Sequence, residues 1–404
     1  MPFAGRRAQL LAQMAPGSVA VVATAPEIVR NRDVHYPYRH DSAFYYLTGF
    51  TEPEAALVLV AASATAPARS LLFCREKDAA REIWDGFRYG PDAARSAFAF
   101  DEASPIGDLE ARLDALPADV QDVTAMIAAL RVIKDASEQA TMLRAATISG
   151  HAHARAMRAA RPGMFEYELE AELLYAFRRS GAQASAYPAI VAAGANACVL
   201  HYGANNAQAQ DGDLVLIDAG CELDSYASDI TRTFPVNGRF TAPQRQLYEL
   251  VLAAQAAALA AVVVGQPYSG IHDAAVHVLT AGMLDLGLLD RAKVGSVDDA
   301  IAAGAFTPFY MHGTGHWLGL DVHDVGLYRE TAGAGSPSRK LMDGMALTVE
   351  PGIYVRPGAG VPEQFWHIGI RIEDDVVVTD AGARILSGAA PKTIAEIEEW
   401  MEQA

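Results

Sequence analysis

Two aspartates border apolar, strand-like runs in the middle of the chain. Asp218 ends the run DLVLIDAG, and Asp229 begins the run DITRTFPV. A carboxylate that is buried without a partner loses its hydration at a large free-energy cost. We therefore expect a positive charge between Asp218 and Asp229. The alternative is that both aspartates lie at the surface and cap a turn.

The segment CELDSYAS, between the two runs, predicts how they pair. A two-residue hairpin turn at 223–224 would place Asp218 directly opposite Asp229. Opposed side chains in an antiparallel pair lie about 4.5–5.5 Å apart at Cβ. Two like charges at that distance on a buried face repel each other, so this pairing would require a cation.

Two glutamates stand in comparable places later in the chain. Glu350 ends the apolar part of MALTVEPGIYV, and we place Glu373 inside the strand IGIRIEDDVVV. A lone glutamate in a strand is typically exposed to solvent or held in a salt bridge. Because several strands carry acids among Val, Leu and Ile, separate solvation of each acid is disfavoured.

Histidines gather in one short segment. MHGTGHWLGLDVHDVG holds His312, His316 and His323, beside glycines that let backbone or ligand approach closely. A single histidine is typically structural, and His201 in CVLHYG has that alternative too. The three histidines of the segment, taken together, indicate one site.

Four carboxylates and one imidazole could hold two divalent ions. A ligand set rich in oxygen with one nitrogen favours Mn²⁺ or a similar ion, whereas a structural zinc site favours Cys and His. Two such ions about 3.5–4 Å apart can share a bridging hydroxide, lower its pKa and polarise a carbonyl. This chemistry is typical of the hydrolysis of an acyl bond.

Composition restricts the partners and the compartment. The 404 residues predict two domains, and the net charge of −17 argues against nucleic acid and against an anionic membrane surface. Three cysteines form no disulfide framework and suit a reducing cytoplasm. The apolar run Leu250–Val264 is shorter than the roughly 20 residues that a membrane-spanning helix needs, so we expect a buried or half-buried helix.

The pattern of elements predicts two different domains. Residues 18–75 contain four strand-like runs, SVAVVAT, AFYYLTGF, AALVLVAA and SLLFC, which indicate a small α/β domain. A helix is expected behind Ser137 as its N-cap, and two more near 242–264 and 270–287. From residue 187 onward the strand-like runs dominate, and antiparallel strands with helices grouped around them predict an α+β domain. We place the domains at 1–134 and 135–404.

Long motifs in the same order resemble one known family. DLVLIDAGCELDSYASDITRTFPVNG, HGTGHWLGLDVHDVG, LTVEPGIYV and GIRIEDD are similar to the pita-bread metallopeptidases, in their aminopeptidase P form. YPYRHDSAFYYLTGFTEPEAALVL is similar to the family's N-terminal domain, here shortened. The resemblance implies a smaller N-terminal α/β domain, followed in the sequence by a catalytic domain with a curved antiparallel sheet and helices.

The resemblance also implies residue roles. The five metal-ligand positions of the family match Asp218, Asp229, His316, Glu350 and Glu373. The substrate-binding positions match His201, His312, His323, Tyr354 and Arg371. His323, Glu350 and His312 would take part in catalysis. The implied cofactor is two divalent ions per subunit, Mn²⁺ before Co²⁺, Zn²⁺ or Fe²⁺.

The implied reaction is the release of an N-terminal residue from peptides with proline at the second position, by a hydroxide that bridges the two metal ions. We also expect a homo-oligomer, a dimer or tetramer, in the cytoplasm that the cysteine content suggests. One alternative is a prolidase, which would cut Xaa-Pro dipeptides with the same site. Further alternatives are a non-catalytic pita-bread binding protein and a metal-free creatinase-like hydrolase, but all five ligand positions hold competent residues.

Overall fold

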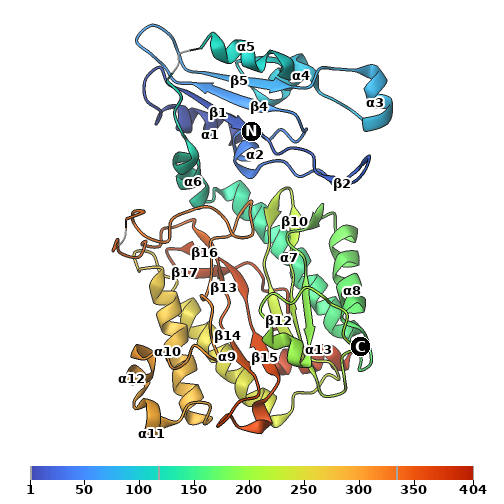
Figure 1. Ribbon diagram of the computed structural model, residues 1–404, viewed down its shortest axis with the longest axis vertical. Coiled ribbons are helices and arrows are strands. Elements are labelled where there is room, and N and C mark those ends of the chain that lie inside the picture. Colours follow the sequence, from blue (N-terminus) through green and yellow to red (C-terminus); the bar gives the residue numbers. More distant parts are fainter. Residues whose placement is uncertain (1, 117–118, 334, 404) are drawn as a thin grey trace. The chain divides into compact units, whose positions relative to one another are not determined.

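The computed structural model describes residues 2–116, 119–333 and 335–403. The chain divides into two compact units, Met1–Arg131 and Val132–Ala404, which are considered separately (Figure 1). The domain limits predicted from the sequence, 1–134 and 135–404, stay a prediction. Among the described residues, no helix combines the length and the apolar character that crossing a membrane requires.

The first unit is built on a four-stranded sheet in the order β1-β4-β5-β6. β1, β4 and β5 pair antiparallel, and β6 joins β5 in parallel. The strands are β1 (Val19–Ala23), β4 (Ala56–Val60), β5 (Arg69–Cys74) and β6 (Glu102–Pro105), with a separate hairpin of β2 (Val29–Asn31) and β3 (Val34–His35). The helices are α1 (Pro2–Leu11), α2 (Ser42–Thr48), α3 (Ala79–Asp85), α4 (Gly90–Phe98), α5 (Leu109–Asp114) and α6 (Thr124–Val132).

One of the four strands expected in this unit is a helix. The run AFYYLTGF forms α2, although its aromatic residues are typical of strands. The Asp41 side chain accepts a hydrogen bond from the backbone N–H of Phe44, and Gly49 ends the helix in a left-handed conformation. These two caps satisfy backbone groups that a short helix otherwise leaves open, which explains why the prediction was wrong.

The second unit combines long helices with short antiparallel sheets, so the predicted α+β class is confirmed (Figure 1). The sheet orders are β11-β10-β7, β12-β9-β8, β13-β16-β17 and β14-β15. The strands are β7 (Ala184–Ser185), β8 (Ile190–Ala193), β9 (Leu214–Asp218), β10 (Cys221–Leu223), β11 (Tyr226–Ala227), β12 (Thr231–Pro235), β13 (Ala346–Val349), β14 (Gly352–Val355), β15 (Ile368–Arg371), β16 (Asp374–Thr379) and β17 (Gly382–Ile385). The helices are α7 (Ala136–Ala159), α8 (Glu166–Arg179), α9 (Ala242–Ala260), α10 (Ser269–Asp285), α11 (Arg291–Val294), α12 (Val297–Ala302) and α13 (Ile394–Glu402).

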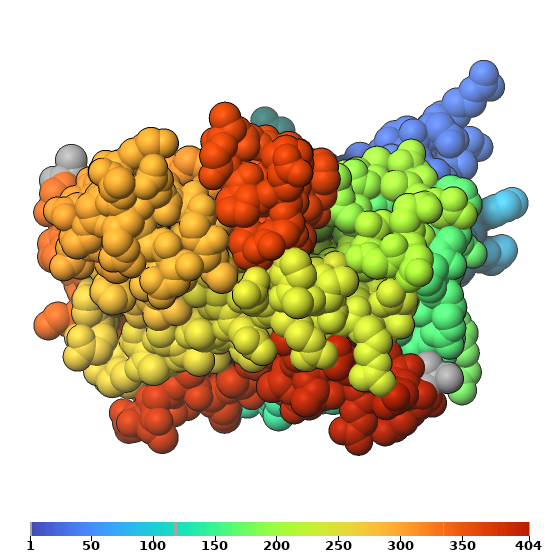
Figure 2. All heavy atoms as spheres, turned by 90° about the horizontal axis from the view of Figure 1, so that it is seen from below, coloured from blue at the N-terminus to red at the C-terminus, as the bar shows by residue number. Residues whose placement is uncertain are grey.

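Helix α9 packs its apolar side chains into the core of this unit. Leu247, Val251 and Ala254 have no exposed surface and belong to one cluster with strand residues such as Ile353 and Ile370. Seen from below, the yellow segment that contains α9 lies directly above the red C-terminal segment (Figure 2). The apolar run expected to form a buried or half-buried helix thus lies largely in α9, which buries one face in this core.

Helix α7 begins slightly earlier than expected. Its N-cap is Asp135 rather than Ser137, and Glu138 completes a capping box with Asp135. A carboxylate and a serine hydroxyl can both accept the bonds that an N-cap receives, so the sequence offered two candidates. The glutamate three residues after Asp135 decides between them.

Candidate active site

The hairpin that carries Asp218 and Asp229 has a different register from the predicted one. Thr231, not Asp229, lies opposite Asp218 in the β9–β12 pair. The turn consists of Asp224 and Ser225, both with positive φ, instead of the residues at 223–224. The pairing therefore differs from the prediction by two residues.

This slip leaves the chemical conclusion intact. Side chains alternate between the two faces of a strand, so a shift of two residues keeps a side chain on its face. Asp218 at the end of β9 and Asp229 just before β12 both line the same cavity. Their side chains are close neighbours, although they are not directly opposed.

The two glutamates also lie at strand ends. Glu350 lies between β13 and β14, where Pro351 interrupts the single strand that the sequence suggested. Glu373 lies between β15 and β16, so its predicted place inside a strand is wrong. An acid at a break in a sheet can turn its side chain into a cavity without disturbing the pairing on either side.

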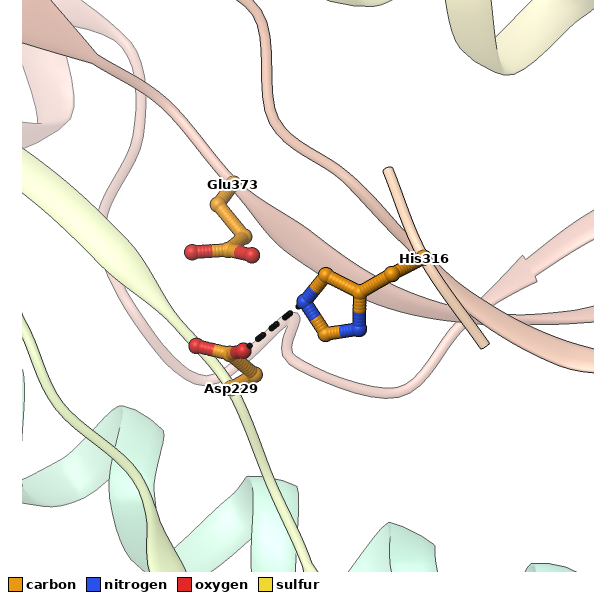
Figure 3. Close-up of side chains that lie close together, drawn as sticks. All are labelled: Asp229, His316 and Glu373. Atoms are coloured by element: carbon orange, nitrogen blue, oxygen red, sulfur yellow. Dashed lines mark ion pairs between the residues drawn. The ribbon is translucent and has the colours of Figure 1, made fainter. Parts of the chain in front are cut away.

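All five predicted metal-ligand residues line one cavity of about 290 Å³. Ligand atoms of Asp229, His316 and Glu373 lie within 4.8 Å of one another, and the three side chains face each other in Figure 3. The cavity is lined by Leu200, His201, Asp218, Asp229, His312, Gly313, Gly315, His316, His323, Glu350, Arg371 and Glu373.

The imidazole of His316 has one nitrogen fixed by the backbone. Its Nδ1 lies 3.0 Å from the carbonyl oxygen of Trp317, which can only accept, so Nδ1 carries a proton. Its Nε2 lies 3.2 Å from Asp229 Oδ2 and 3.7 Å from Glu350 Oε1. The Nε2 atom therefore points at carboxylate oxygens, which is the orientation of a nitrogen that ligates a cation beside them.

Burial and mutual repulsion perturb the pKa values of the acids. Burial, followed by the charges of the neighbouring carboxylates, holds the pKa of Glu373 well above its ordinary value. Burial also raises the pKa of Asp218, and raises that of Glu350 to about 7. For Asp229, burial is outweighed by the hydrogen bond and charge of His316, so its pKa is lowered. Burial opposes the protonation of His316, but Asp229 and Glu350 raise its pKa to about 9.

Arg371 provides a fixed positive charge at the edge of the cluster. Its Nη2 lies 2.5 Å from Asp218 Oδ2, and its other nitrogens donate to Tyr354 at 3.0 Å and to Thr231 at 3.1 Å. Thr231 in turn donates to Glu373 Oε2 at 2.6 Å. These bonds orient two of the carboxylates toward the cavity.

The donor set fits divalent cations. Four carboxylates and one imidazole nitrogen converge on the cavity, against the single guanidinium of Arg371. Oxygen-rich ligation with one nitrogen suits Mn²⁺ and related ions. Cations among these groups would relieve the repulsion that raises the pKa of Glu373.

The predicted substrate-binding residues occupy different depths. His201, His312, His323 and Arg371 line the cavity. Tyr354 is fully buried and lies behind the lining, where its hydroxyl contacts His312 Nε2 at 2.8 Å and Arg371. Burial, with help from the charge of Arg371, lowers the pKa of His312 to about 4, so its imidazole is neutral.

Comparisons with known proteins identify the family of the chain. Residues 140–380 match the model of metallopeptidase family M24, and residues 3–124 match the N-terminal domain of aminopeptidase P. The chain belongs to metallopeptidase family M24. The resemblance inferred from the motifs is thereby confirmed.

Relatives and solved structures cover nearly the whole chain. A Xaa-Pro aminopeptidase of Escherichia coli is 42% identical over 440 residues, which cover 100% of this chain and 98% of the relative. The structure of the Pseudomonas aeruginosa aminopeptidase PepP matches with a TM-score of 0.93 and 47% identity, over 99% of this chain and 97% of that one. A zinc-substituted E. coli aminopeptidase P in complex with product matches with a TM-score of 0.94 and 42% identity, over 99% and 98% of the two chains.

The structure adds residues to this M24 site that the sequence did not indicate. The Tyr187 hydroxyl lies 2.6 Å from Asp218 Oδ1 and 2.5 Å from Asp229 Oδ1. Thr231 contacts Glu373, as described above. Thr231 follows Asp229 at a spacing of two, so the alternation of the strand could have placed it on the same face. Tyr187 precedes β8 in AYPAIV, where nothing in the sequence singles it out.

A larger cavity adjoins the acidic one. It has a volume of about 720 Å³ and shares His312, Gly313 and Gly315 with the acidic cavity. Its other walls include Phe306 and Tyr310. The loop that holds His312 and His316 therefore borders both cavities, one of them acidic and the other walled in part by aromatic rings.

Proposed function

We infer that this protein is a metal-dependent Xaa-Pro aminopeptidase, which hydrolyses the bond between an N-terminal residue and a following proline. One observation carries this conclusion. Five side chains of metal-ligating type, from Asp218 to Glu373 in the sequence, meet in one cavity of a chain that belongs to family M24. The relatives that share nearly the whole chain bear the name Xaa-Pro aminopeptidase.

The proposed ligands of two ions are Asp218, Asp229, His316, Glu350 and Glu373. Divalent ions bound among them would polarise the scissile carbonyl and lower the pKa of a water molecule. We propose Mn²⁺, because the donor set is rich in oxygen; Co²⁺, Zn²⁺ and Fe²⁺ have similar ligand demands.

The chain's own groups would orient the substrate and move protons. His323 lines the cavity and would donate a hydrogen bond near the scissile carbonyl, where negative charge develops. Glu350, which also lines the cavity, would carry a proton to the leaving nitrogen. His312, His201 and Arg371 would line the substrate site, with Tyr354 holding His312 and Arg371 in place.

The proposed substrates are peptides with proline at the second position. An Xaa-Pro bond is a tertiary amide whose ring fixes the backbone, so its nitrogen must receive a proton from a defined side. The neighbouring cavity of about 720 Å³ offers space for residues beyond proline, which favours an aminopeptidase over a strict dipeptidase.

We also propose a homo-oligomer, a dimer or tetramer, in the cytoplasm. The first unit exposes large apolar side chains on one segment: Ile83 is 82% exposed, Trp84 83% and Phe87 65%. Exposed apolar side chains that lie together are typical of interaction surfaces. The three cysteines are all free and buried, which suits a reducing compartment.

A peptide-length series tests the proposed function. Purified protein with added Mn²⁺ is assayed on Xaa-Pro, Xaa-Pro-Xaa and Xaa-Ala-Xaa peptides, and released amino acids are quantified. We expect turnover of Xaa-Pro-Xaa, little of Xaa-Ala-Xaa, and loss of activity in chelator that Mn²⁺ restores. Turnover of Xaa-Pro alone would assign a prolidase, and no turnover of either proline peptide would refute the proposal.

A further inference from the structure

A buried ion pair lies next to the acidic cavity but outside its lining. Lys134 Nζ is 3.0 Å from Asp324 Oδ2, and each side chain is only 1% exposed. Desolvation of two charges costs free energy that the pair's attraction only partly returns, so such a pair is weak evidence for stability alone. In some proteins a buried polar or charged group is retained because it fixes one conformation.

Asp324 closes a loop that begins at the metal-ligating histidine. Between residues 317 and 324 the chain forms neither helix nor strand apart from one isolated bridge at Trp317. The backbone N–H of Asp324 donates to the carbonyl oxygen of Trp317 at 2.8 Å. This closure brings His323 back onto His316, whose ring it stacks against with centroids 3.9 Å apart.

The pair packs directly against the backbone of this loop. A Cβ atom at Gly319 would lie 2.2 Å from Asp324 Oδ2 and 3.0 Å from Lys134 Cε. A side chain at this position would therefore displace the carboxylate from the lysine. The absence of a side chain at Gly319 allows the two charged groups to fill the space under the loop.

His323 itself has few restraints. Its side chain is exposed at the cavity, and the contact given for its ring in the described part of the chain is the stacking on His316. Its direction depends on the stacking with His316 and on the backbone that Asp324 fixes one residue later. A group that must donate to a developing charge needs a fixed position, because a displacement of about 1 Å can cost about 10²-fold in rate.

We propose that Lys134 is a positioning residue for His323, acting through Asp324. The ammonium group holds the Asp324 carboxylate beneath the loop, and this keeps His323 aimed into the acidic cavity. The proposal rests on the proposed function, in which His323 contacts the scissile carbonyl. It assigns a mechanistic task to a lysine that lies outside every motif used to recognise the family.

A double-mutant cycle tests the proposal. Lys134→Met and His323→Ala are made singly and together, and kcat, KM and metal content are measured on an Xaa-Pro-Xaa peptide with Mn²⁺, below the unfolding midpoint of each variant. We expect Lys134→Met to lower kcat by roughly 10- to 100-fold, with KM and metal content unchanged. In the His323→Ala background it should lower kcat no further, because residues that act as a unit are not additive.

Controls separate this result from a general loss of structure. Lys392→Met removes another lysine paired with a buried aspartate, since Lys392 Nζ lies 2.6 Å from Asp374. Its effect should add to that of His323→Ala. If Lys134→Met does not fold, Asp324→Asn keeps the shape without the charge and completes the same cycle.

The possible outcomes are distinct. An equal loss from Lys134→Met in both backgrounds, or a loss confined to KM or metal content, would overturn the positioning role. Wild-type protein that fails to hydrolyse any proline peptide would instead refute the proposed function.

Discussion

Arg232→Met should destabilise the second unit more than any surface arginine substitution. Arg232 is 1% exposed and makes hydrogen bonds in several directions. Its Nη2 bonds Asp374 Oδ1 at 2.8 Å, and its Nη1 donates to the carbonyl oxygen of Glu373 at 2.5 Å and to that of Thr231 at 3.0 Å. The arginine therefore ties β12 to the segment that carries Glu373.

The size of the effect follows from what the substitution leaves behind. Methionine has a similar length but no donors, so buried carbonyl groups lose their partners. Asp374, which is fully buried, keeps Lys392, Ser387 and Gln255 as partners. Removal of one partner of a buried pair costs about 3–5 kcal/mol. Because Lys392 remains, we expect about 3 kcal/mol. At roughly 2–4 °C per kcal/mol for a unit of this size, the unfolding midpoint should fall by about 6–12 °C.

The assay is differential scanning calorimetry of both variants in chelator, so that bound metal does not contribute to the midpoint. Arg239→Met is the matched control, because Arg239 also pairs with acids, Glu398 and Glu402, but its side chain is 58% exposed. Exposed pairs contribute about 0–1 kcal/mol. A fall for Arg232→Met no larger than that for Arg239→Met would show that the buried network does not stabilise the unit.

Further predictions concern the site. Asp229→Ala should abolish metal binding and activity while the fold is retained, as measured by elemental analysis, a peptidase assay and circular dichroism. The control Asp343→Ala, which removes an exposed acid, should change neither metal binding nor activity. Full activity of a metal-depleted Asp229→Ala protein would contradict the ligand assignment. His323→Ala should lower kcat by roughly 10²-fold, the scale of a lost oxyanion donor, while the exposed His277→Ala should not; an effect on KM alone would instead indicate a binding role. Gly315→Ala should lower both the unfolding midpoint and the metal content, because its Cβ would lie 2.0 Å from the carbonyl oxygen of Thr348. Gly313→Ala should leave the midpoint unchanged, since its nearest neighbour is at 3.9 Å, and equal midpoints for both glycine variants would refute this reasoning.

The metal cluster was accessible to sequence reasoning because its members break local patterns. Acids at the ends of apolar runs cannot be explained by burial alone, so Asp218, Asp229, Glu350 and Glu373 stood out. Their convergence did not require a correct register, because an error of two residues keeps each side chain on its face. The roles assigned to these residues stay predictions that the variants above test.

The groups that support the cluster carried no such signal. Strand alternation could have placed Thr231 on the face of Asp229, but its contact with Glu373 at 2.6 Å is seen only in the coordinates. The same holds for Tyr187, which lies outside the strands and contacts Asp218 at 2.6 Å. The capping residues of helix α2 also carried too weak a signal, and the strand predicted there was wrong. Asp41 and Gly49 convert an aromatic run into helix α2, although the run itself is typical of a strand.

Three consecutive acids, Glu373, Asp374 and Asp375, include both a proposed metal ligand and groups that support it. All three side chains are buried, with exposures of 2%, 0% and 1%. Glu373 faces the metal cavity, and Asp374 bonds Arg232 and Lys392. Asp375 accepts the backbone N–H of Asp229 at 3.1–3.2 Å.

Each acid of this run therefore has a separate environment. Glu373 would bind the cations, and Asp374 anchors the segment to the buried Arg232. Asp375 holds the backbone of Asp229, which is another proposed ligand. A segment anchored in this way can keep Glu373 in place against the repulsion of the other carboxylates before a cation binds. Groups outside the cavity thus anchor the acids that we propose as metal ligands, so the positions of those acids in the sequence do not reveal what supports the site.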